Sequence, residues 1–212
     1  MKRRSILLLF FIVFSASAFA QKPFKSTLRS GDILFQDLDC GELCDAIEQV
    51  TESYGGRHFS HLGLVSVEGA FTFVIEAIGD KVQRIPIEVF LGRNRNEIFL
   101  GRVKNEFQNV AAKANDFAQH QIDVPYDDAF LVNNGKYYCS ELLYDAFKFG
   151  NNGTDFFELQ PMTFMQPKTN IFFPAWEAYY QKLQMPIPEG APGINPGGIS
   201  MSPKLDVFLY RK

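Results

Sequence analysis

The chain has 212 residues, of which 46% are hydrophobic and 21% are charged, and its formal net charge is −3 at pH 7. This length suffices for one domain with a sizeable hydrophobic core. The acidic balance argues against a nucleic-acid-binding protein and against electrostatic docking on an anionic lipid surface.

The first twenty residues have the pattern of a secretory signal peptide. Three basic residues precede an apolar run that ends in AFA, a small-x-small cleavage site. We therefore expect residues 1–20 to be removed, which changes the formal charge from −3 to −6, and residues 21–212 to form a single domain. No cysteine lies near the cleavage point, so we expect a periplasmic or secreted protein without a lipid anchor. An uncleaved membrane anchor is the alternative, and no later segment is apolar for long enough to cross a membrane.

Strand and helix signals follow one another without regular alternation. Helical spacing of apolar residues predicts four helices, whereas β-rich runs bounded by turn residues predict strands, two of which form an antiparallel pair at 59–67 and 71–79. A mixture of this kind indicates the α+β class. The helices are expected at 41–52, 106–121, 139–150 and 174–184, and the remaining strands at 31–38, 81–87, 97–103 and 205–210.

Two segments are expected to lack regular structure, and one helix has an aromatic face. The segment 124–138 is expected to be a loop or short strand, and 185–203 is a connection rich in Pro and Gly. Trp176, Tyr179 and Tyr180 form an apolar stripe on the last predicted helix. We expect these rings to fill the core, with a role at the border of an apolar groove as the alternative.

The three cysteines make an odd number, which is unusual for an exported chain. Cys40 and Cys44 are four residues apart on a predicted helix, so their Cα atoms would lie about 6 Å apart, near the upper end of the disulfide range. They form either a strained bridge or two packed thiols. Cys139 is left over, and an unpaired cysteine in this setting indicates an intermolecular link or a reactive thiol.

Cys139 lies at the start of a predicted helix within YYCSELLYDAF. Free backbone N–H groups and the helix dipole there stabilise a thiolate and the oxyanion that forms when it attacks a carbonyl. The alternative is a buried cysteine that acts as a small hydrophobic residue.

A thiolate nucleophile needs a base, and the chain contains three histidines. His61 begins the apolar run HLGLV and would project from the end of a strand, whereas His58 lies in a loop and His120 ends a helix. Glu76 is a carboxylate within an otherwise apolar strand, so it needs a partner, either His61 or a structural one such as Arg84. No C-x₂-C pair exists and His58 with His61 lacks further ligands, so neither a metal nor an organic cofactor is expected.

An ordered set of motifs resembles the permuted papain-like cysteine hydrolases of the YaeF/YiiX group, relatives of the NlpC-type cell-wall peptidases and of lecithin retinol acyltransferase. The set is LRSGDILFQ, AIEQVT, FSHLGLV, VIEA, VPYDDAF, YYCSELLYDAF and NPGGISMSP, which together span most of the chain after the leader. The resemblance implies a circularly permuted papain-like fold, in which an antiparallel sheet or barrel packs against helices and the histidine strand precedes the cysteine helix.

The resemblance also implies roles for individual residues. Cys139 becomes the nucleophile, His61 the general base and Glu76 its orienting partner, while Tyr126 and Tyr138 line the substrate site. Tyr126 either helps to bind the oxyanion or packs. The segment TESYGGRHFSH departs from the family pattern, since it looks longer than usual and contains a second histidine.

These observations predict an exported cysteine hydrolase that cleaves amide bonds through an acyl-thioester. By resemblance, its substrate is a cell-wall peptide or an N-acyl, lipid-like amide. Two alternatives remain: an acyltransferase that uses the same triad, and a non-catalytic envelope binding protein with an inert thiol.

Overall fold

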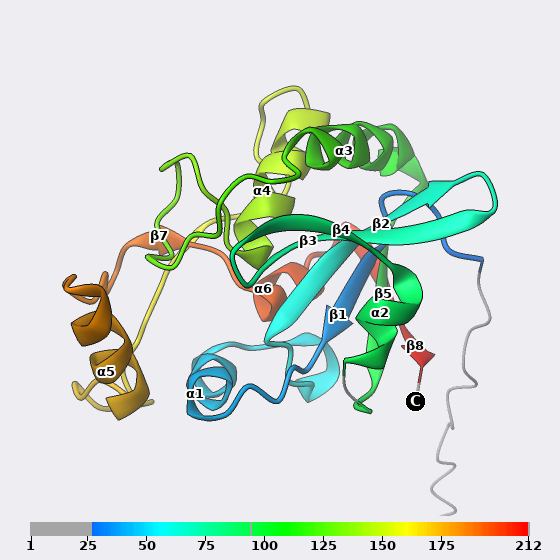
Figure 1. Ribbon diagram of the computed structural model, residues 1–212. Coiled ribbons are helices and arrows are strands. Elements are labelled where there is room, and N and C mark those ends of the chain that lie inside the picture. The colour runs from blue at the N-terminus through cyan, green and yellow to red at the C-terminus, as the bar shows by residue number, and fades with distance from the viewer. Residues whose placement is uncertain (1–26, 94, 212) are drawn as a thin grey trace, which may run out of the picture.

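The computed structural model describes residues 27–93 and 95–211 of the chain. Six strands form one antiparallel sheet in the order β4-β3-β2-β1-β5-β8. Figure 1 shows α3 and α4 together on one side of this sheet, with α1 and α5 near one another at the opposite end of the molecule. The α+β prediction is therefore confirmed, whereas the predicted signal peptide at 1–20 lies outside the described residues.

The helices and strands alternate irregularly along the chain. The sheet contains β1 (Ile33–Gln36), β2 (His61–Glu68), β3 (Phe71–Ile78), β4 (Lys81–Pro86), β5 (Ile98–Val103) and β8 (Leu205–Arg211), and a separate short pair contains β6 (Gln160–Pro161) and β7 (Pro192–Gly193). The α-helices are α1 (Glu42–Val50), α2 (Ile87–Gly92), α3 (Gln108–His120), α4 (Cys139–Gly150), α5 (Pro174–Leu183) and α6 (Pro196–Ser200).

Three segments differ from the sequence-based expectation. The strand predicted at 81–87 ends at Pro86, because the chain turns there into α2. The connection at 185–203 contains β7 and the short helix α6, whose cap Asn195 accepts a hydrogen bond from the Gly198 N–H. The helix predicted at 41–52 begins only at Glu42, because Gly41 precedes it with a φ of 78°.

Alternate side chains of the central strand β1 enter two different cores, as the period of two in a strand requires. Ile33 and Phe35 pack in the core that includes α3 and α4. Leu34, between them, packs with Ile87 and Phe90 of α2 on the other face. All four residues of β1 are buried, which identifies this strand as the centre of a sheet covered on both sides.

A third apolar cluster joins α1 to α5. Trp176 and Tyr180 of α5 pack there with Phe164, and Leu43 and Ile47 of α1 contact the same cluster. Tyr180 also donates a hydrogen bond from its hydroxyl to the Ala129 carbonyl at 3.1 Å. The aromatic stripe of α5 thus fills a core, as expected, and this core lies apart from the one beneath α3 and α4.

Gly31 and Asp32, just before β1, contact α3, β5 and the segment around Arg29. Gly31 has a φ of 89°, and a methyl group on it would lie 2.6 Å from the Ala111 Cβ of α3. The buried Asp32 carboxylate accepts two hydrogen bonds from Arg102 of β5, at 2.8 and 2.6 Å, and another from the Arg29 N–H. Only glycine fits where α3 crosses the start of the sheet.

Within the described residues, no helix combines the length and the apolar character that a bilayer crossing requires.

We predict that Gly31→Ala lowers the free energy of unfolding by about 3 kcal/mol, because it adds overpacking against Ala111 to the strain of a positive φ. The matched control is Gly79→Ala, which has a φ of 66° and open space around the added methyl group. It should cost only the conformational strain, about 1 kcal/mol. Urea denaturation of both variants measures the difference, and equal losses would contradict the role given to the Gly31–Ala111 contact.

Candidate active site

Cys139 is the first residue of α4 and is 8% exposed. Tyr138 before it is extended, and the first N–H inside the helix to find its intrahelical carbonyl is that of Leu142, which donates to Tyr138 at 3.1 Å. The N–H groups of the first turn therefore have no intrahelical acceptor and face the region of the sulfur. Cys139 is also the free cysteine of the described residues, because the other two are bonded to each other.

His61, the first residue of β2, is the histidine that meets this cysteine. Its side chain is buried, and its Nε2 lies 2.7 Å from Glu76 Oε2. The Cys139 thiol lines the same pocket and interacts with the ring. Since Glu76 occupies Nε2, Nδ1 is the ring nitrogen that faces the thiol. His61 thus bridges a carboxylate and a sulfur.

The other two histidines lie elsewhere. His58 is exposed and its Nδ1 is 3.7 Å from a carboxylate oxygen of Glu48. The His120 ring is also exposed and lies 2.7 Å from the Asp116 carbonyl oxygen within α3. The longer segment before β2 therefore leaves His61 in place beside the cysteine.

Glu76 of β3 is completely buried, and three side chains hold its carboxylate. Besides His61, Gln83 of β4 donates to Oε1 at 2.9 Å, and Arg93 donates to both oxygens, at 2.6 Å to Oε2. The structural partner considered from the sequence, Arg84, pairs instead with Glu68. A bidentate arginine pair is the arrangement that best compensates a buried carboxylate.

Opposing effects set the charges of this group. Burial by itself would raise the pKa of Glu76, but hydrogen bonds from Arg93 and His61 outweigh it and lower the pKa to about 2. Burial alone would lower the pKa of His61, but its bonds to Cys139 and Glu76 raise that pKa to about 9. At neutral pH the buried carboxylate is ionised and the imidazole holds its second proton.

Gly63 of β2 provides the space in which Glu76 is held. A methyl group on Gly63 would lie 2.4 Å from Val74 Cγ1, 3.1 Å from Phe90 Cε2 and 3.5 Å from Glu76 Cβ. The Phe90 ring is also 6.0 Å from the His61 ring. The glycine of HLGLV therefore allows α2 to pack closely over the histidine and the glutamate.

The two tyrosines expected at the site both line the same pocket as Cys139. Burial, together with the neighbouring Cys139, raises the pKa of Tyr126 well above its ordinary value, so its hydroxyl remains a donor. Tyr138 is buried, and its hydroxyl accepts a hydrogen bond from the Ile194 N–H at 3.2 Å. Tyr126 thus lies at the site with a hydroxyl proton to donate. The hydroxyl of Tyr138 is instead hydrogen-bonded to the backbone of Ile194.

Glu141, two residues after the cysteine, carries a second buried carboxyl group. Burial raises its pKa to about 8, against the opposing effect of a hydrogen bond from the Asn133 N–H at 3.1 Å. At neutral pH this group is therefore largely protonated and uncharged. No second negative charge then competes with a thiolate for the positive end of α4.

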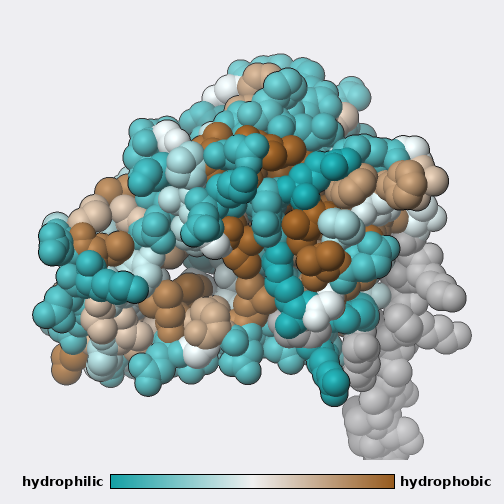
Figure 2. All heavy atoms as spheres, in the orientation of Figure 1, coloured by the Kyte–Doolittle hydropathy of each residue, from teal (hydrophilic) through white to brown (hydrophobic). Residues whose placement is uncertain are grey.

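A pocket of about 280 Å³ opens beside Cys139, His61 and Tyr126. Its walls come from α1, from the end of β3, from the segment around β6 and β7, and from α5 and the start of α6. Figure 2 shows the surface hollowed above α1, with hydrophobic residues along its border. The reactive groups thus lie at one end of a largely apolar pocket.

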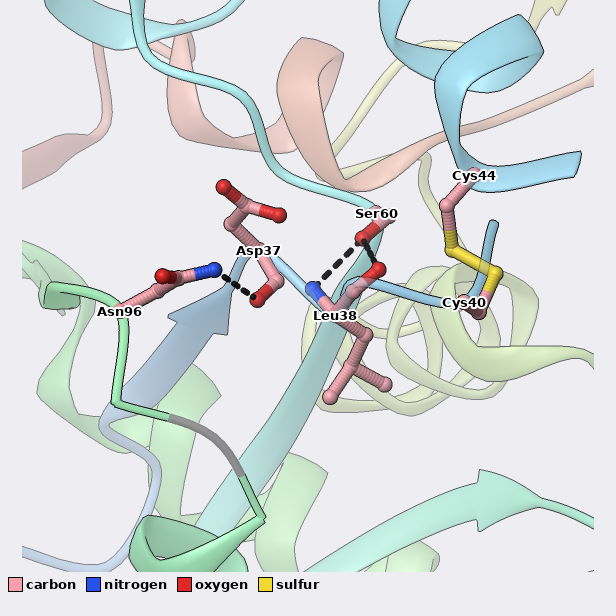
Figure 3. The surroundings of a disulfide bond; sticks show 6 residues. All are labelled: Asp37, Leu38, Cys40, Cys44, Ser60 and Asn96. Atoms are coloured by element: carbon pink, nitrogen blue, oxygen red, sulfur yellow. Dashed lines mark hydrogen bonds between the residues drawn. A yellow bond between two sulfur atoms is a disulfide. The ribbon is translucent and has the colours of Figure 1, made fainter. Parts of the chain in front are cut away.

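Cys40 and Cys44 form a disulfide on the wall of this pocket, with their Cα atoms 5.4 Å apart (Figure 3). Ser60 accepts a hydrogen bond from the Leu38 N–H at 2.8 Å and donates one to the Leu38 carbonyl at 3.1 Å. The bridge and these bonds together fix the connection between β1 and α1 to the residue that precedes His61. Of the two alternatives left open by the sequence, the structure contains the bridge.

Sequence reasoning missed Arg93 and Gln83 as partners of Glu76. Arg93 directly follows the short helix α2, which was predicted neither as a helix nor as part of the site. The sequence did indicate that such a partner exists, since a carboxylate buried beside a histidine requires a cation to compensate its negative charge. Only the placement of α2 identifies which cation it is.

Comparisons with known proteins identify the family and the fold of this chain. A family model described as a permuted papain-like amidase enzyme of the YaeF/YiiX, C92 family matches residues 27–208. The uncharacterized protein YiiX of Escherichia coli strain K12 is 26% identical over 150 residues, which cover 70% of this chain and 68% of that protein. The crystal structure titled metalloprotein yiiX, from Escherichia coli O157:H7, has a TM-score of 0.67 and 22% identity, and the match covers 84% of this chain and 95% of that chain. The permuted papain-like fold implied by the sequence motifs is confirmed.

The two shifted pKa values predict stability losses at both ends of the pH scale. The pKa of Glu76 is lowered from 4.5 to about 2, so its contribution is complete above pH 4.5 and is lost as the pH falls through 2. The pKa of His61 is raised from 6.5 to about 9, so its contribution is complete below pH 6.5 and is lost as the pH rises through 9. Each loss amounts to about 3 kcal/mol, and the His61–Glu76 bond contributes to both.

Urea unfolding between pH 2 and pH 10 measures these losses. Glu76→Gln should remove the acid limb, because it removes the titrating acid, and should reduce the alkaline limb, because it removes one of the two groups that raise the pKa of His61, the other being Cys139. The exposed Glu177→Gln is the control and should leave the curve unchanged. Superimposable curves for wild type and Glu76→Gln would refute the coupling.

Proposed function

This chain belongs to the permuted papain-like amidase family, and on that basis we propose that it is a cysteine hydrolase that cleaves amide bonds with Cys139 as its nucleophile. The observation that carries the proposal is the position of His61, buried between the Glu76 carboxylate at 2.7 Å and the Cys139 thiol. A nucleophile, a base and a group that orients the base are the components that covalent acyl transfer requires.

In the first half of the proposed reaction, the Cys139 thiolate attacks the amide carbonyl and forms a carbon–sulfur bond. The electron pair of the carbonyl moves to its oxygen. When the carbon–nitrogen bond breaks, the imidazolium of His61 gives its proton to the departing amine. The products of this half-reaction are a free amine and an acyl-thioester on Cys139.

In the second half, neutral His61 takes a proton from a water molecule, whose oxygen attacks the thioester carbonyl. The carbon–sulfur bond breaks, the carboxylic acid leaves, and the thiolate–imidazolium pair is restored. Glu76 does not touch the substrate in this scheme. It keeps Nδ1 of His61 directed at the sulfur, and Arg93 and Gln83 keep the Glu76 carboxylate in place.

Both tetrahedral intermediates carry an oxyanion, for which two kinds of donor are available. The first-turn N–H groups of α4 have no intrahelical acceptor, and the Tyr126 hydroxyl keeps its proton. We assign the oxyanion to these donors, because preorganised donors at this position contribute strongly to such reactions. Tyr138 supports the site from behind through its bond with Ile194.

The Escherichia coli structure is titled a metalloprotein. Across residues 27–93 and 95–211 of this chain, no three His, Cys, Asp or Glu side chains gather into a set that could hold a metal ion. The proposed steps are written with the side chains of the chain itself.

We also propose that the protein acts after export, in the periplasm or outside the cell. The Cys40–Cys44 disulfide supports this location, since structural disulfides persist in oxidising compartments. The basic and apolar pattern of residues 1–20, which is typical of a secretory signal peptide, also supports export.

For the nucleophile, we predict rapid alkylation of Cys139 by iodoacetamide at pH 6 to 7, where the raised pKa of His61 keeps the imidazolium charged. His61→Ala should slow labelling at this pH at least tenfold, and Glu76→Gln should lie between the two. His58→Ala is the matched control and should label at the wild-type rate, since its side chain is exposed and pairs elsewhere. Mass spectrometry of the labelled peptide gives the rates.

Equal rates for wild type and His61→Ala would sink the catalytic assignment and favour a binding protein with an inert thiol. If the labelling behaves as predicted, product analysis with added alcohols or amines separates a hydrolase, which releases the acid, from an acyltransferase, which modifies the acceptor.

For export, we predict that protein isolated from its native cells begins at Gln21 and carries one disulfide. Intact mass before and after reduction and alkylation measures both features: one alkylated thiol without reductant and three with it. Three free thiols in the isolated protein would contradict export, whereas a chain that retains residues 1–20 would favour the uncleaved membrane anchor over a cleaved signal peptide.

A further inference from the structure

Gln36, the last residue of β1, is a polar side chain within an apolar layer. It is fully buried, and its Nε2 donates a hydrogen bond to the carbonyl of Phe90 in α2 at 2.8 Å. Among the described residues its Oε1 has no hydrogen-bond partner, although this atom is buried too. We propose that Gln36 is a positioning residue that fixes the end of α2, so that Arg93 stays on Glu76. This inference rests on the proposed amidase function and adds a residue to its support.

Packing alone does not account for an amide at this position. A buried carbonyl oxygen without a donor costs free energy, and an apolar side chain of similar volume would fill the space without that cost. What the amide adds is one directed hydrogen bond to the backbone of α2. This bond is therefore the feature that distinguishes Gln36 from the apolar residues of the same layer.

The helix that accepts this bond is short and has little support of its own. α2 has six residues, and its N-cap Pro86 makes no side-chain hydrogen bond to the first turn. Isolated helices of this length are unstable in water, so tertiary contacts must hold them. Ile87 and Phe90 supply the apolar contacts. Gln36 supplies a polar contact whose direction is set by its donor and acceptor.

The Phe90 carbonyl links this contact to Arg93. The Arg93 N–H donates to the Phe90 carbonyl at 3.4 Å, and the Gln36 amide donates to the same oxygen from the sheet. The guanidinium carbon of Arg93 also lies 5.5 Å from the centroid of the Phe90 ring. A displacement of this carbonyl therefore moves the residue that holds both oxygens of Glu76.

Register in the sheet places the same glutamine beside the histidine. Gln36 and His61 are paired between β1 and β2, and residues paired in this way project on the same face. The Phe90 ring, whose own carbonyl Gln36 holds, has its centroid 6.0 Å from that of the His61 ring. Gln36 thus acts on the site through α2, as a fully buried side chain that does not touch the substrate.

The pKa of Glu76 reports whether Arg93 is in place. Burial raises this pKa, and the hydrogen bonds from Arg93 are the largest of the effects that lower it. Gln36→Met keeps the volume and removes the donor, so it should raise the pKa of Glu76 by about 1, a tenfold change in its ionisation constant. The lowered pKa stabilises the fold above pH 4.5, and this contribution is lost as the pH falls. In urea unfolding, the loss caused by Gln36→Met should therefore be larger at pH 7 than at pH 2, by about 1 kcal/mol.

Two further comparisons make this test specific. Gln108→Met removes an equivalent bond elsewhere, since Gln108 Nε2 donates to the Val103 carbonyl at 2.9 Å, and its loss should be the same at both pH values. Gln36→Met in an Arg93→Met background should show no pH-dependent difference, because the residue through which Gln36 acts is absent. Gln36→Leu is the second apolar replacement, used if the methionine variant does not fold.

The reactivity of Cys139 connects this effect to the proposed reaction. Gln36→Met should slow iodoacetamide labelling of Cys139 at pH 6 to 7 by about threefold, because the imidazole is held less firmly. Gln108→Met should label at the wild-type rate.

The outcomes separate the role of Gln36 from the function on which it rests. An equal loss of stability at pH 2 and pH 7 in Gln36→Met would overturn the positioning role. The same pH-dependent difference in the Arg93→Met background would overturn the route through Arg93. A pH-dependent difference in Gln36→Met, together with Cys139 labelling that ignores His61→Ala, would support the hold on Arg93 and overturn the amidase proposal.

Discussion

A carboxylate that is entirely removed from water governs the design of this molecule. Burying an ionised Glu76 without partners would cost many kcal/mol, and the usual escape is protonation. Arg93 keeps the carboxylate ionised by donating hydrogen bonds to both oxygens, and Gln83 donates a further hydrogen bond. The carboxylate therefore stays charged, and its remaining lone pair holds His61. The charges alternate from the Arg93 guanidinium to the Glu76 carboxylate to the His61 imidazolium, and the imidazolium interacts with Cys139.

The connectivity of the sheet places the imidazole, the carboxylate and the two groups that hold the carboxylate within one continuous stretch of chain. His61, Glu76 and Gln83 lie on three adjacent antiparallel strands, and Arg93 follows the helix that closes the last of them. The thiol comes from α4, which packs against β2 and β3, the strands that carry His61 and Glu76. The site forms where the first turn of α4 meets these strands.

Much of this arrangement was predictable because it depends on short-range patterns. Three short-range signals were visible in the sequence: a thiol at a helix start, a histidine that opens an apolar strand, and the lone glutamate in VIEA. Each places a polar or reactive side chain in an apolar segment, where it needs a partner. The position of Arg93 was not predictable, because it depends on α2, whose six residues carry too little periodicity to separate a helix from the end of a strand. The disulfide was left open for a related reason: placing Cys40 on the helix overlooked the positive φ of Gly41, which starts the helix after it.

The four-residue separation of Cys40 and Cys44 matters for which pair of cysteines in this chain closes most readily. Their loop is far shorter than either loop to Cys139, so its closure costs the least chain entropy and is the first to occur during oxidative folding. The native pocket later brings all three sulfur atoms to its walls, at a stage when two of them are already consumed. The pair with the shortest loop is thus the pair that the structure bonds, which leaves the Cys139 thiol free.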